Sequence, residues 1–192
     1  MVRTFLIRHI NTLWLMLVVA CAGLLLLYPE AISKNSIADF LANLGASALF
    51  IYLLLSLARS LLMIPCTPFV LAGGISFPEI PAVVMVISYA GIVTGAFLVY
   101  SFPSFGHYDA YLEGKYPNKL LFLREKLHGR HAFWIVAGWS FFPFVPTDLI
   151  CYVAGVVKMS FRKMASAVVI GEIPLVTLYV YVGIEIGDLL RT

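Results

Sequence analysis

The sequence predicts an all-α integral membrane protein: an inverted repeat of two re-entrant helical hairpins, each followed by a transmembrane helix, plus an N-terminal transmembrane helix. The first observation is composition, because 61% of the 192 residues are hydrophobic and only 12% are charged, whereas soluble domains have about 25% charged residues. The second is a repeat in which paired prolines, Pro65 with Pro68 and Pro143 with Pro146, interrupt apolar segments. Paired broken helices in the two halves of a membrane protein are typical of a transport site.

The N-terminal part, residues 1–35, is predicted to be a transmembrane anchor and a loop. Its apolar stretch Ile10–Tyr28 approaches the roughly 20 residues that cross the hydrocarbon as a helix. Arg3 and Arg8 precede it, as in the basic start of a cleaved signal peptide. Apolar sequence continues past Cys21, so we favour an uncleaved anchor over that alternative.

Residues 36–192 are predicted to form one membrane domain, which begins with a hairpin at about 51–77. Prolines remove backbone donors, so a continuous helix through lipid would leave carbonyls unsatisfied at several kcal/mol each. A kinked spanning helix is the simpler alternative, and residues 40–64 could also cross with tilt. Pro65, Gly73 and Gly74 are the predicted structural residues of this hairpin. A span at 80–102 follows.

Segment 104–131 is predicted to be an amphipathic segment on the cytoplasmic surface. In a helix, the spacing places four side chains on one apolar face: Tyr116, Leu120, Leu123 and Leu127. Basic residues lie between them in the sequence, as expected of a helix in the headgroup layer. The predicted headgroup contacts are Lys119, Arg124 and Arg130. A solvated charged loop is the alternative.

The second hairpin, at about 132–161, repeats the first. Its predicted structural residues are Pro143 and Gly155, and a last span at 164–187 follows it. This order predicts that the two hairpins enter from opposite faces of the membrane.

Charge placement orients the chain with its N-terminus in the cytoplasm. Most Lys and Arg then fall inside, in segments 1–9, 103–131 and 158–163, while Lys34 and Arg191 fall outside, as the positive-inside rule requires. The net charge of +3 needs no nucleic-acid partner, because these cations lie where anionic lipid headgroups are. Glycine-rich faces make a homo-dimer plausible.

The chemistry is predicted at the hairpin tips. Thr67 has the residue type of an N-cap before a helix that starts with a proline, and Pro146-Thr147 offers similar residues to the second hairpin. Helix N-termini that converge from opposite leaflets would form a pocket suited to an anion. The predicted substrate-binding residues are Arg59, Thr67, Pro68, Ser140, Pro146 and Thr147.

Arg59 would add a full positive charge at membrane depth, where an arginine is costly and is a functional candidate by default. The alternative is structural: its side chain snorkels, or it binds carbonyls that the broken helix leaves unpaired. Ser140 stands at the corresponding distance from the second proline pair.

Asp148 and Glu172 are acidic residues at predicted membrane depth. Burial penalises an ionised carboxylate, so each is expected to ionise only beside a cation such as Arg59, which would allow a proton to be coupled to cargo. Alternatively, Asp148 caps a helix and Glu172 hydrogen-bonds a hairpin.

The sequence predicts no metal site, no cofactor and no enzymatic activity. The histidines lie in interfacial segments, no spacing of His, Cys and Asp resembles a metal site, and the sequence has neither a Walker loop nor a G-x-S-x-G motif. Cys66 and Cys151 are expected to be buried small apolar residues at related repeat positions, where they could approach each other.

Several segments together resemble the DedA/VTT (SNARE-associated) superfamily. They are Arg59–Pro65, Leu71–Gly74, Pro143–Pro146, Tyr152–Gly155, Met159–Phe161 and Gly171–Pro174. The resemblance covers about residues 40–187 and implies opposed re-entrant hairpins, a bacterial inner-membrane location and movement of lipids between leaflets. The chain departs from the family pattern in two places. Ser140 stands where second hairpins of the family often hold an arginine, and no carboxylate lies between Asp39 and Glu79.

The expected function is therefore lipid transport of the flippase or scramblase kind. The cargo would be a phosphate-bearing lipid, such as undecaprenyl phosphate or a phospholipid, whose headgroup passes between the hairpin tips. The alternative is a proton-coupled exporter of small solutes or drugs. An enzyme that acts on lipid phosphate and a scaffold for partner proteins are further alternatives.

Overall fold

The structure of this chain is a computed structural model. It describes residues 33–62, 64–104, 108–143 and 145–191, together with scattered residues between 13 and 30. The predicted N-terminal span Ile10–Tyr28 is described in part, and most of its described residues are helical; the rest of the span lies outside the described residues. Within the described ranges every regular element is a helix.

The helices follow the same order twice along the chain. The first half contains α2 (Lys34–Ala42), η2 (Gly45–Ser47), α3 (Ala48–Ala58), η3 (Arg59–Leu62), α4 (Thr67–Ser76), α5 (Pro81–Ser101) and η4 (Phe102–Ser104). The second half contains α6 (Tyr108–Lys115), α7 (Pro117–His128), α8 (Ala132–Phe141), α9 (Thr147–Val156) and α10 (Phe161–Arg191). In each half a broken pair of short helices precedes one long helix.

Among the described residues, two helices are long and apolar enough to cross a membrane. Pro81–Ser104 has 24 residues and Phe161–Leu189 has 29 residues, so at about 1.5 Å per residue they are roughly 36 and 43 Å long. Large apolar side chains such as Phe97 and Leu178 are exposed along them. Such exposure suits helices that face lipid.

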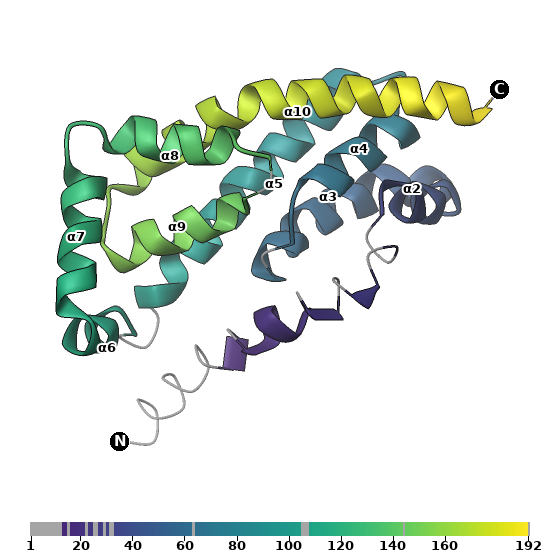
Figure 1. The fold of residues 1–192 in the computed structure, drawn as a ribbon. Coiled ribbons are helices and arrows are strands. Elements are labelled where there is room, and N and C mark those ends of the chain that lie inside the picture. The colour runs from purple at the N-terminus through teal and green to yellow at the C-terminus, as the bar shows by residue number, and fades with distance from the viewer. Residues whose placement is uncertain are drawn as a thin grey trace.

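The two broken pairs are α3 with α4 and α8 with α9, and their helices are apolar but short. Helices α4, α8 and α9 have 10 residues each, which gives about 15 Å, half of the hydrocarbon thickness. The breaks lie at the proline pairs, because proline lacks the N–H of a continuous helix. In Figure 1 the two pairs turn their breaks toward the middle of the bundle from opposite ends.

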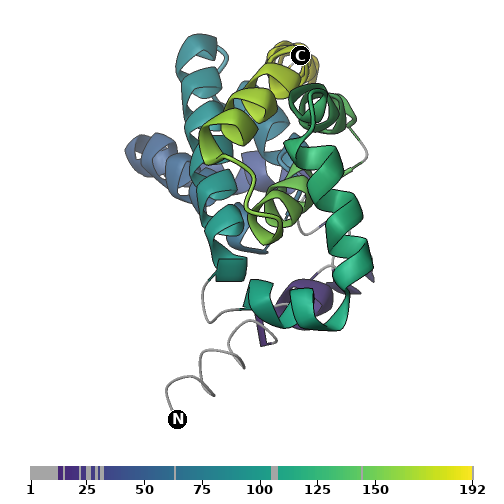
Figure 2. The ribbon, with the colours of Figure 1, turned by 90° about the vertical axis from the view of Figure 1, so that its left-hand side faces the viewer.

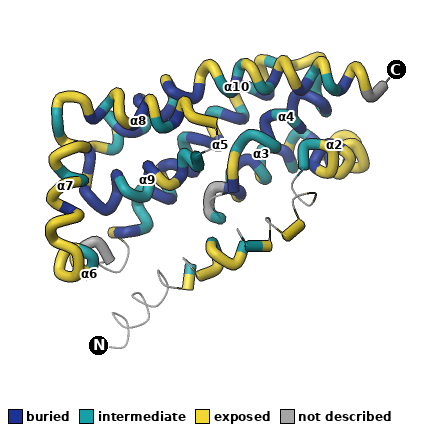
Figure 3. The backbone as a smooth tube through the Cα atoms, in the orientation of Figure 1, coloured by how far each residue is buried: buried dark blue, intermediate teal, exposed yellow. Residues whose placement is uncertain are grey.

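Each long helix packs against a short helix of the other half of the chain. Helix α4 packs on α10, and α9 packs on α5, while α3 and α8 pack on the long helix of their own half. Glycines allow these contacts, because a Cβ at Gly74 would clash with the Val180 carbonyl and a Cβ at Gly155 with the Tyr100 carbonyl. The buried core lies between these helices (Figure 3).

Segment 104–131 is mostly helical, so the solvated-loop interpretation is wrong for α6 and α7. In Figures 1 and 2, α7 runs crosswise to α10 at the end where α10 begins. The predicted apolar face of α7 packs on the protein, because Leu120 and Leu127 are buried. The outward apolar side chains are Leu121 and Phe122. The protein core therefore covers part of the predicted face, whereas Tyr116 of the same face is exposed.

Candidate functional site at the two breaks

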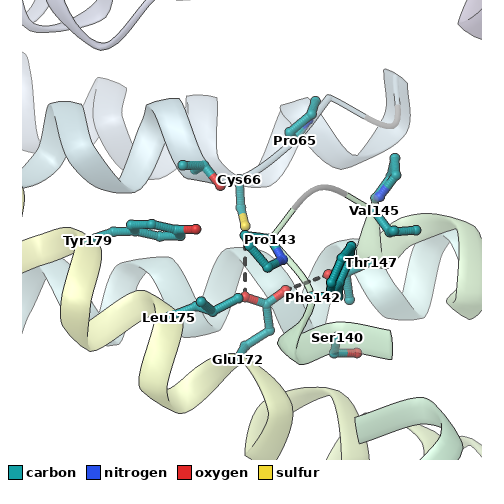
Figure 4. Close-up of a pocket in the computed structure, with 12 residues that line it drawn as sticks. Pro65, Cys66, Ser140, Phe142, Pro143, Val145, Thr147, Glu172, Leu175 and Tyr179 are labelled. Carbon is teal, nitrogen blue, oxygen red and sulfur yellow. Dashed lines mark hydrogen bonds between the residues drawn. The ribbon is translucent and has the colours of Figure 1, made fainter. Parts of the chain in front are cut away.

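The two breaks meet at a pocket of about 60 Å³. Both breaks and one long helix line it: Pro65, Cys66, Thr67, Ser140, Phe142, Pro143, Val145, Pro146, Thr147, Glu172, Leu175 and Tyr179 (Figure 4). The non-helical turn of the first broken pair lies against the non-helical turn of the second. Residues that are far apart in the sequence therefore line the same cavity.

A smaller cavity of about 20 Å³ lies next to this pocket and holds the charged groups. Arg59, Asp148 and Glu172 line it, together with Pro65, Cys66, Ile92, Ala96, Thr147 and Cys151. Glu172 and Thr147 line both cavities, so the two spaces form one candidate site with an outer pocket and an inner cavity.

Arg59 lies at the start of η3 and is 7% exposed. Its Nη1 donates to the Ile64 carbonyl at 2.9 Å and lies 3.6 Å from Asp148 Oδ2. The structural interpretation of Arg59 is therefore correct in part, because the guanidinium does bind a carbonyl of the broken segment. The same group also faces a carboxylate of the other half of the chain.

Asp148 lies in the first turn of α9 and is 6% exposed. The 3.6 Å separation from Arg59 is an ion pair that is too long for a hydrogen bond. Asp148 does not cap its helix, because no side chain makes a cap hydrogen bond at the start of α9. An arginine is the partner that a buried carboxylate needs most, since an unpaired buried charge is costly.

The predicted N-cap assignments are wrong for both helices. Cys66 is the N-cap of α4, Pro146 is the N-cap of α9, and neither helix has a side-chain cap hydrogen bond. Thr67 and Thr147 are instead the first helical residues. The hydroxyl of Thr147 donates to Glu172 Oε1, which supplies the hydrogen bond that a buried carboxylate needs.

Glu172 connects both breaks to α10. Its side chain is 2% exposed, and its two carboxylate oxygens accept from different breaks: Oε1 from the Thr147 hydroxyl and Oε2 from the Cys66 thiol at 3.9 Å. Figure 4 shows both contacts as dashed lines. The prediction that Glu172 could hydrogen-bond a hairpin therefore agrees with the structure.

Ser140 lies in the wall of the outer pocket. It is 1% exposed, and its hydroxyl has no hydrogen-bond partner among the described residues. A buried hydroxyl without a partner is unusual and marks a position where a ligand or water would gain a hydrogen bond.

Several predicted residues lie outside the site. Pro68 lines neither cavity, and Gly73, Gly74 and Gly155 lie at helix contacts. Lys119 and Arg130 are exposed on the α6–α7 side of the molecule. Arg124 forms an ion pair with Glu113 at 2.8 Å on the surface of the protein. Among the residues that the structure describes, no group of three His, Cys, Asp or Glu could hold a metal ion.

The sequence interpretation missed the α10 side of the pocket. Leu175 and Tyr179 follow Glu172 by one and two helical turns and line the outer pocket with it. The spacing could have predicted this, because residues three and seven positions apart lie on the same face of a helix. Trp139 was also missed, and its Nε1 donates to the Pro146 carbonyl at 3.3 Å. Cys66 and Cys151 line the same inner cavity as free thiols.

Comparison with known proteins identifies the chain through its family. The family model named VTT domain matches residues 64–185, a range that contains both proline pairs, both carboxylates of the site, the whole of α5 and most of α10. No curated protein and no solved structure matches the chain. Proteins of this family are generally non-enzymatic membrane proteins. The chain belongs to the DedA/VTT family of membrane proteins.

Proposed function

We propose that this protein moves phosphate-bearing lipids between the leaflets of a bacterial inner membrane. The headgroup would pass through the site where the two breaks meet, and the acyl or prenyl tails would stay in the bilayer. The single observation that carries the proposal is a buried arginine in a cavity between two opposed helix breaks.

The proposal requires the two broken pairs to be re-entrant hairpins related as an inverted repeat. Their short helices support this, because an apolar helix of about 15 Å reaches only the middle of the hydrocarbon. Backbone that is not helical is tolerated at that depth where protein buries it or where it lines a cavity. Both breaks line the same pocket.

Arg59 is proposed to bind the phosphate. Its only hydrogen bond to the described residues goes to Ile64, so most of the five guanidinium donors remain for a ligand. The starts of α4 and α9, which have no side-chain caps, would add N–H groups and a partial positive charge.

Asp148 and Glu172 are proposed to tune this charge. Asp148 faces Arg59, so an arriving phosphate competes with it for the guanidinium. Glu172 holds the two breaks together through Thr147 and Cys66. The pocket of about 60 Å³ admits only a small group, so these contacts must loosen before a headgroup can pass. Lys119 and Arg130 are proposed to contact headgroups at the cytoplasmic surface.

The test is leaflet exchange in vesicles that contain the purified protein and fluorescent phospholipids. Wild type is expected to accelerate exchange, and Arg59→Ala is expected to reduce the rate at least tenfold, because the phosphate loses its cation. The matched control is Arg162→Ala, since Arg162 is exposed at the start of α10. Exchange at the level of empty vesicles for wild type across several lipids would contradict the proposal.

A proton-coupled exporter of small solutes is the second candidate. The small volume of the pocket and the two carboxylates of the site favour it. Uptake of a soluble substrate that requires a proton gradient, and that depends on Asp148 more than on Arg59, would select this candidate instead.

A further inference from the structure

Helix α10 contains a proline in its interior, Pro174. A proline inside a helix offers no N–H to the carbonyl four positions earlier, here that of Ile170, and its ring pushes that carbonyl away. Sharp bends in helices occur mainly at such positions. The other long helix differs, because Pro81 is its first residue and residues 82–101 contain no proline. The missing hydrogen bond therefore makes Pro174 a bending point in α10.

The parts of α10 before and after Pro174 pack on different broken pairs. Before the proline, a Cβ at Gly171 would clash with the Ala137 carbonyl of α8. After the proline, a Cβ at Gly183 would clash with the Leu71 carbonyl of α4. Backbones that are packed this closely move together. A bend at Pro174 therefore moves α8 relative to α4.

The same division runs through the outer pocket. Leu175 and Tyr179 follow the proline and line the pocket from the part of α10 that packs on α4, whereas Glu172 precedes the proline. In Figure 4 the Glu172 side chain lies between Cys66 of the first break and Thr147 of the second. The lining residues therefore belong to two bodies that a bend in α10 would separate, and the pocket would widen between them.

The contacts that hold α10 in its present shape are weak. The Cys66 thiol donates to Glu172 Oε2 at 3.9 Å, and a thiol is a weak donor. The Tyr89 hydroxyl of α5 donates to the Ile173 carbonyl at 3.3 Å, directly before the proline. The Thr147 hydroxyl also donates to Glu172, but Thr147 follows α8 in the same broken pair, so this contact can persist when α10 bends.

The inner cavity lies on the side of the other long helix, because Ile92 and Ala96 of α5 line it. Helix α5 packs closely on both broken pairs. A Cβ at Gly91 would clash with the Ser56 carbonyl of α3, and Gly155 of α9 lies against the backbone of α5. Because α5 has no proline in its interior, it holds the two pairs together at the inner cavity while α10 bends.

We infer that α10 is a hinged wall of the site: bending at Pro174 breaks the contact between Glu172 and Cys66 and opens the outer pocket, while the inner cavity keeps its shape. This inference rests on the proposed function and adds how a headgroup enters a pocket of about 60 Å³. Pro174 and Tyr89 are positioning residues, because neither is among the residues that line the two cavities.

The test follows the Cys66 thiol in the native chain, because opening of the pocket exposes this thiol. N-ethylmaleimide is applied to the protein in vesicles, and the labelling rate of each cysteine is measured by mass spectrometry of its peptide. Pro174→Ala restores the backbone donor, so it is expected to slow both Cys66 labelling and lipid exchange about tenfold, which corresponds to about 1.4 kcal/mol in favour of the closed form.

The matched control is Pro81→Ala, because Pro81 stands at the start of α5, where an N–H would have no partner within the helix. This variant is expected to change neither rate. Cys151 is the internal reference. It is fully buried and lines the inner cavity, so its labelling is expected to be the same in every variant.

Tyr89→Phe tests the hinge from the opposite direction. It removes the hydrogen bond to the Ile173 carbonyl, so Cys66 labelling and lipid exchange are both expected to become about threefold faster, the effect of losing one neutral hydrogen bond. Unchanged or slower Cys66 labelling in this variant would contradict the role of Tyr89 in holding the hinge closed.

The outcomes separate the hinge from lipid transport. Equal Cys66 labelling in wild type and Pro174→Ala overturns the hinge, and lipid exchange that still requires Arg59 then leaves transport intact. Labelling of Cys66 and Cys151 that changes in parallel also overturns the hinge, because it reports loosening of the whole protein. Cys66 labelling that depends on Pro174, in a protein that exchanges no lipid, supports the hinge and contradicts the proposed function.

Discussion

Arg59 and Asp148 come from different halves of the chain and meet in the core at 3.6 Å. The pair was foreseeable only in part. A buried carboxylate was expected to need a cation, and Arg59 was the cation at the right depth. The carboxylate that faces Arg59 is set by how α9 packs against η3. This packing cannot be inferred from the local sequence.

The pair gives a prediction about stability that is separate from transport. Arg59→Ala leaves the Asp148 carboxylate buried without its counter-charge, which costs about 3–5 kcal/mol. Adding Asp148→Asn removes the orphaned charge, so the double variant is expected to be more stable than Arg59→Ala alone. Thermal unfolding in detergent measures the stability of Arg59→Ala and of the double variant. A double variant less stable than Arg59→Ala would show that the two side chains do not compensate each other.

At the scale of single residues, the N-caps were the clearest error. Thr67 and Thr147 have the residue type that caps helices, yet each lies one position inside its helix. An N-cap side chain accepts from a backbone N–H, whereas the Thr147 hydroxyl donates to Glu172. That carboxylate comes from α10, so the contact could not be seen in the local sequence.

At the scale of elements, the breaks were predictable because the constraint of proline is local. Pro65 and Pro143 end their helices wherever the rest of the chain lies. The outcome for α7 was different, because only Leu120 and Leu127 of its predicted apolar face are buried. Periodicity reports that a face is buried, and it does not report whether protein or lipid covers it.

The contact between α9 and α5 gives a prediction at this scale. A Cβ at Gly155 would clash with the Tyr100 carbonyl, whereas nothing lies within 4 Å of a Cβ at Gly138 on α8. Gly155→Ala is therefore expected to destabilise the protein by about 1–3 kcal/mol through overpacking. Gly138→Ala is the matched control and is expected to be neutral or stabilising by up to about 1 kcal/mol, since alanine favours helix.

Thermal unfolding midpoints of the two variants in the same detergent check this prediction. Equal midpoints would mean that α9 does not rest on α5 as closely as the structure has it. Because α9 holds Asp148, a shift of this helix would also move the ion pair, so Gly155→Ala is expected to slow lipid exchange.

At the scale of the whole molecule, the two halves exchange partners. The second helix of each broken pair packs on the long helix of the other half, so neither half can complete the site alone. Arg59 comes from one half, while Asp148 and Glu172 come from the other. Repeats in the sequence indicated two similar units, and the exchange of packing partners became visible only in three dimensions.

This arrangement makes sense for transport if the two broken pairs enter the membrane from opposite faces. The site would then lie near the midplane, with one pair closing it toward each side. Lys34, ahead of the first pair, and Lys119, ahead of the second, would lie in different compartments.

The most direct measurement labels single cysteines at these two positions. Lys34→Cys and Lys119→Cys are made separately in a variant without Cys21, Cys66 and Cys151 that retains lipid exchange, and an impermeant maleimide is applied to vesicles of known orientation. We predict that position 34 reacts from the outside and position 119 from the cytoplasmic side. Reaction of both positions from one compartment would contradict the opposed architecture and the transport route built on it.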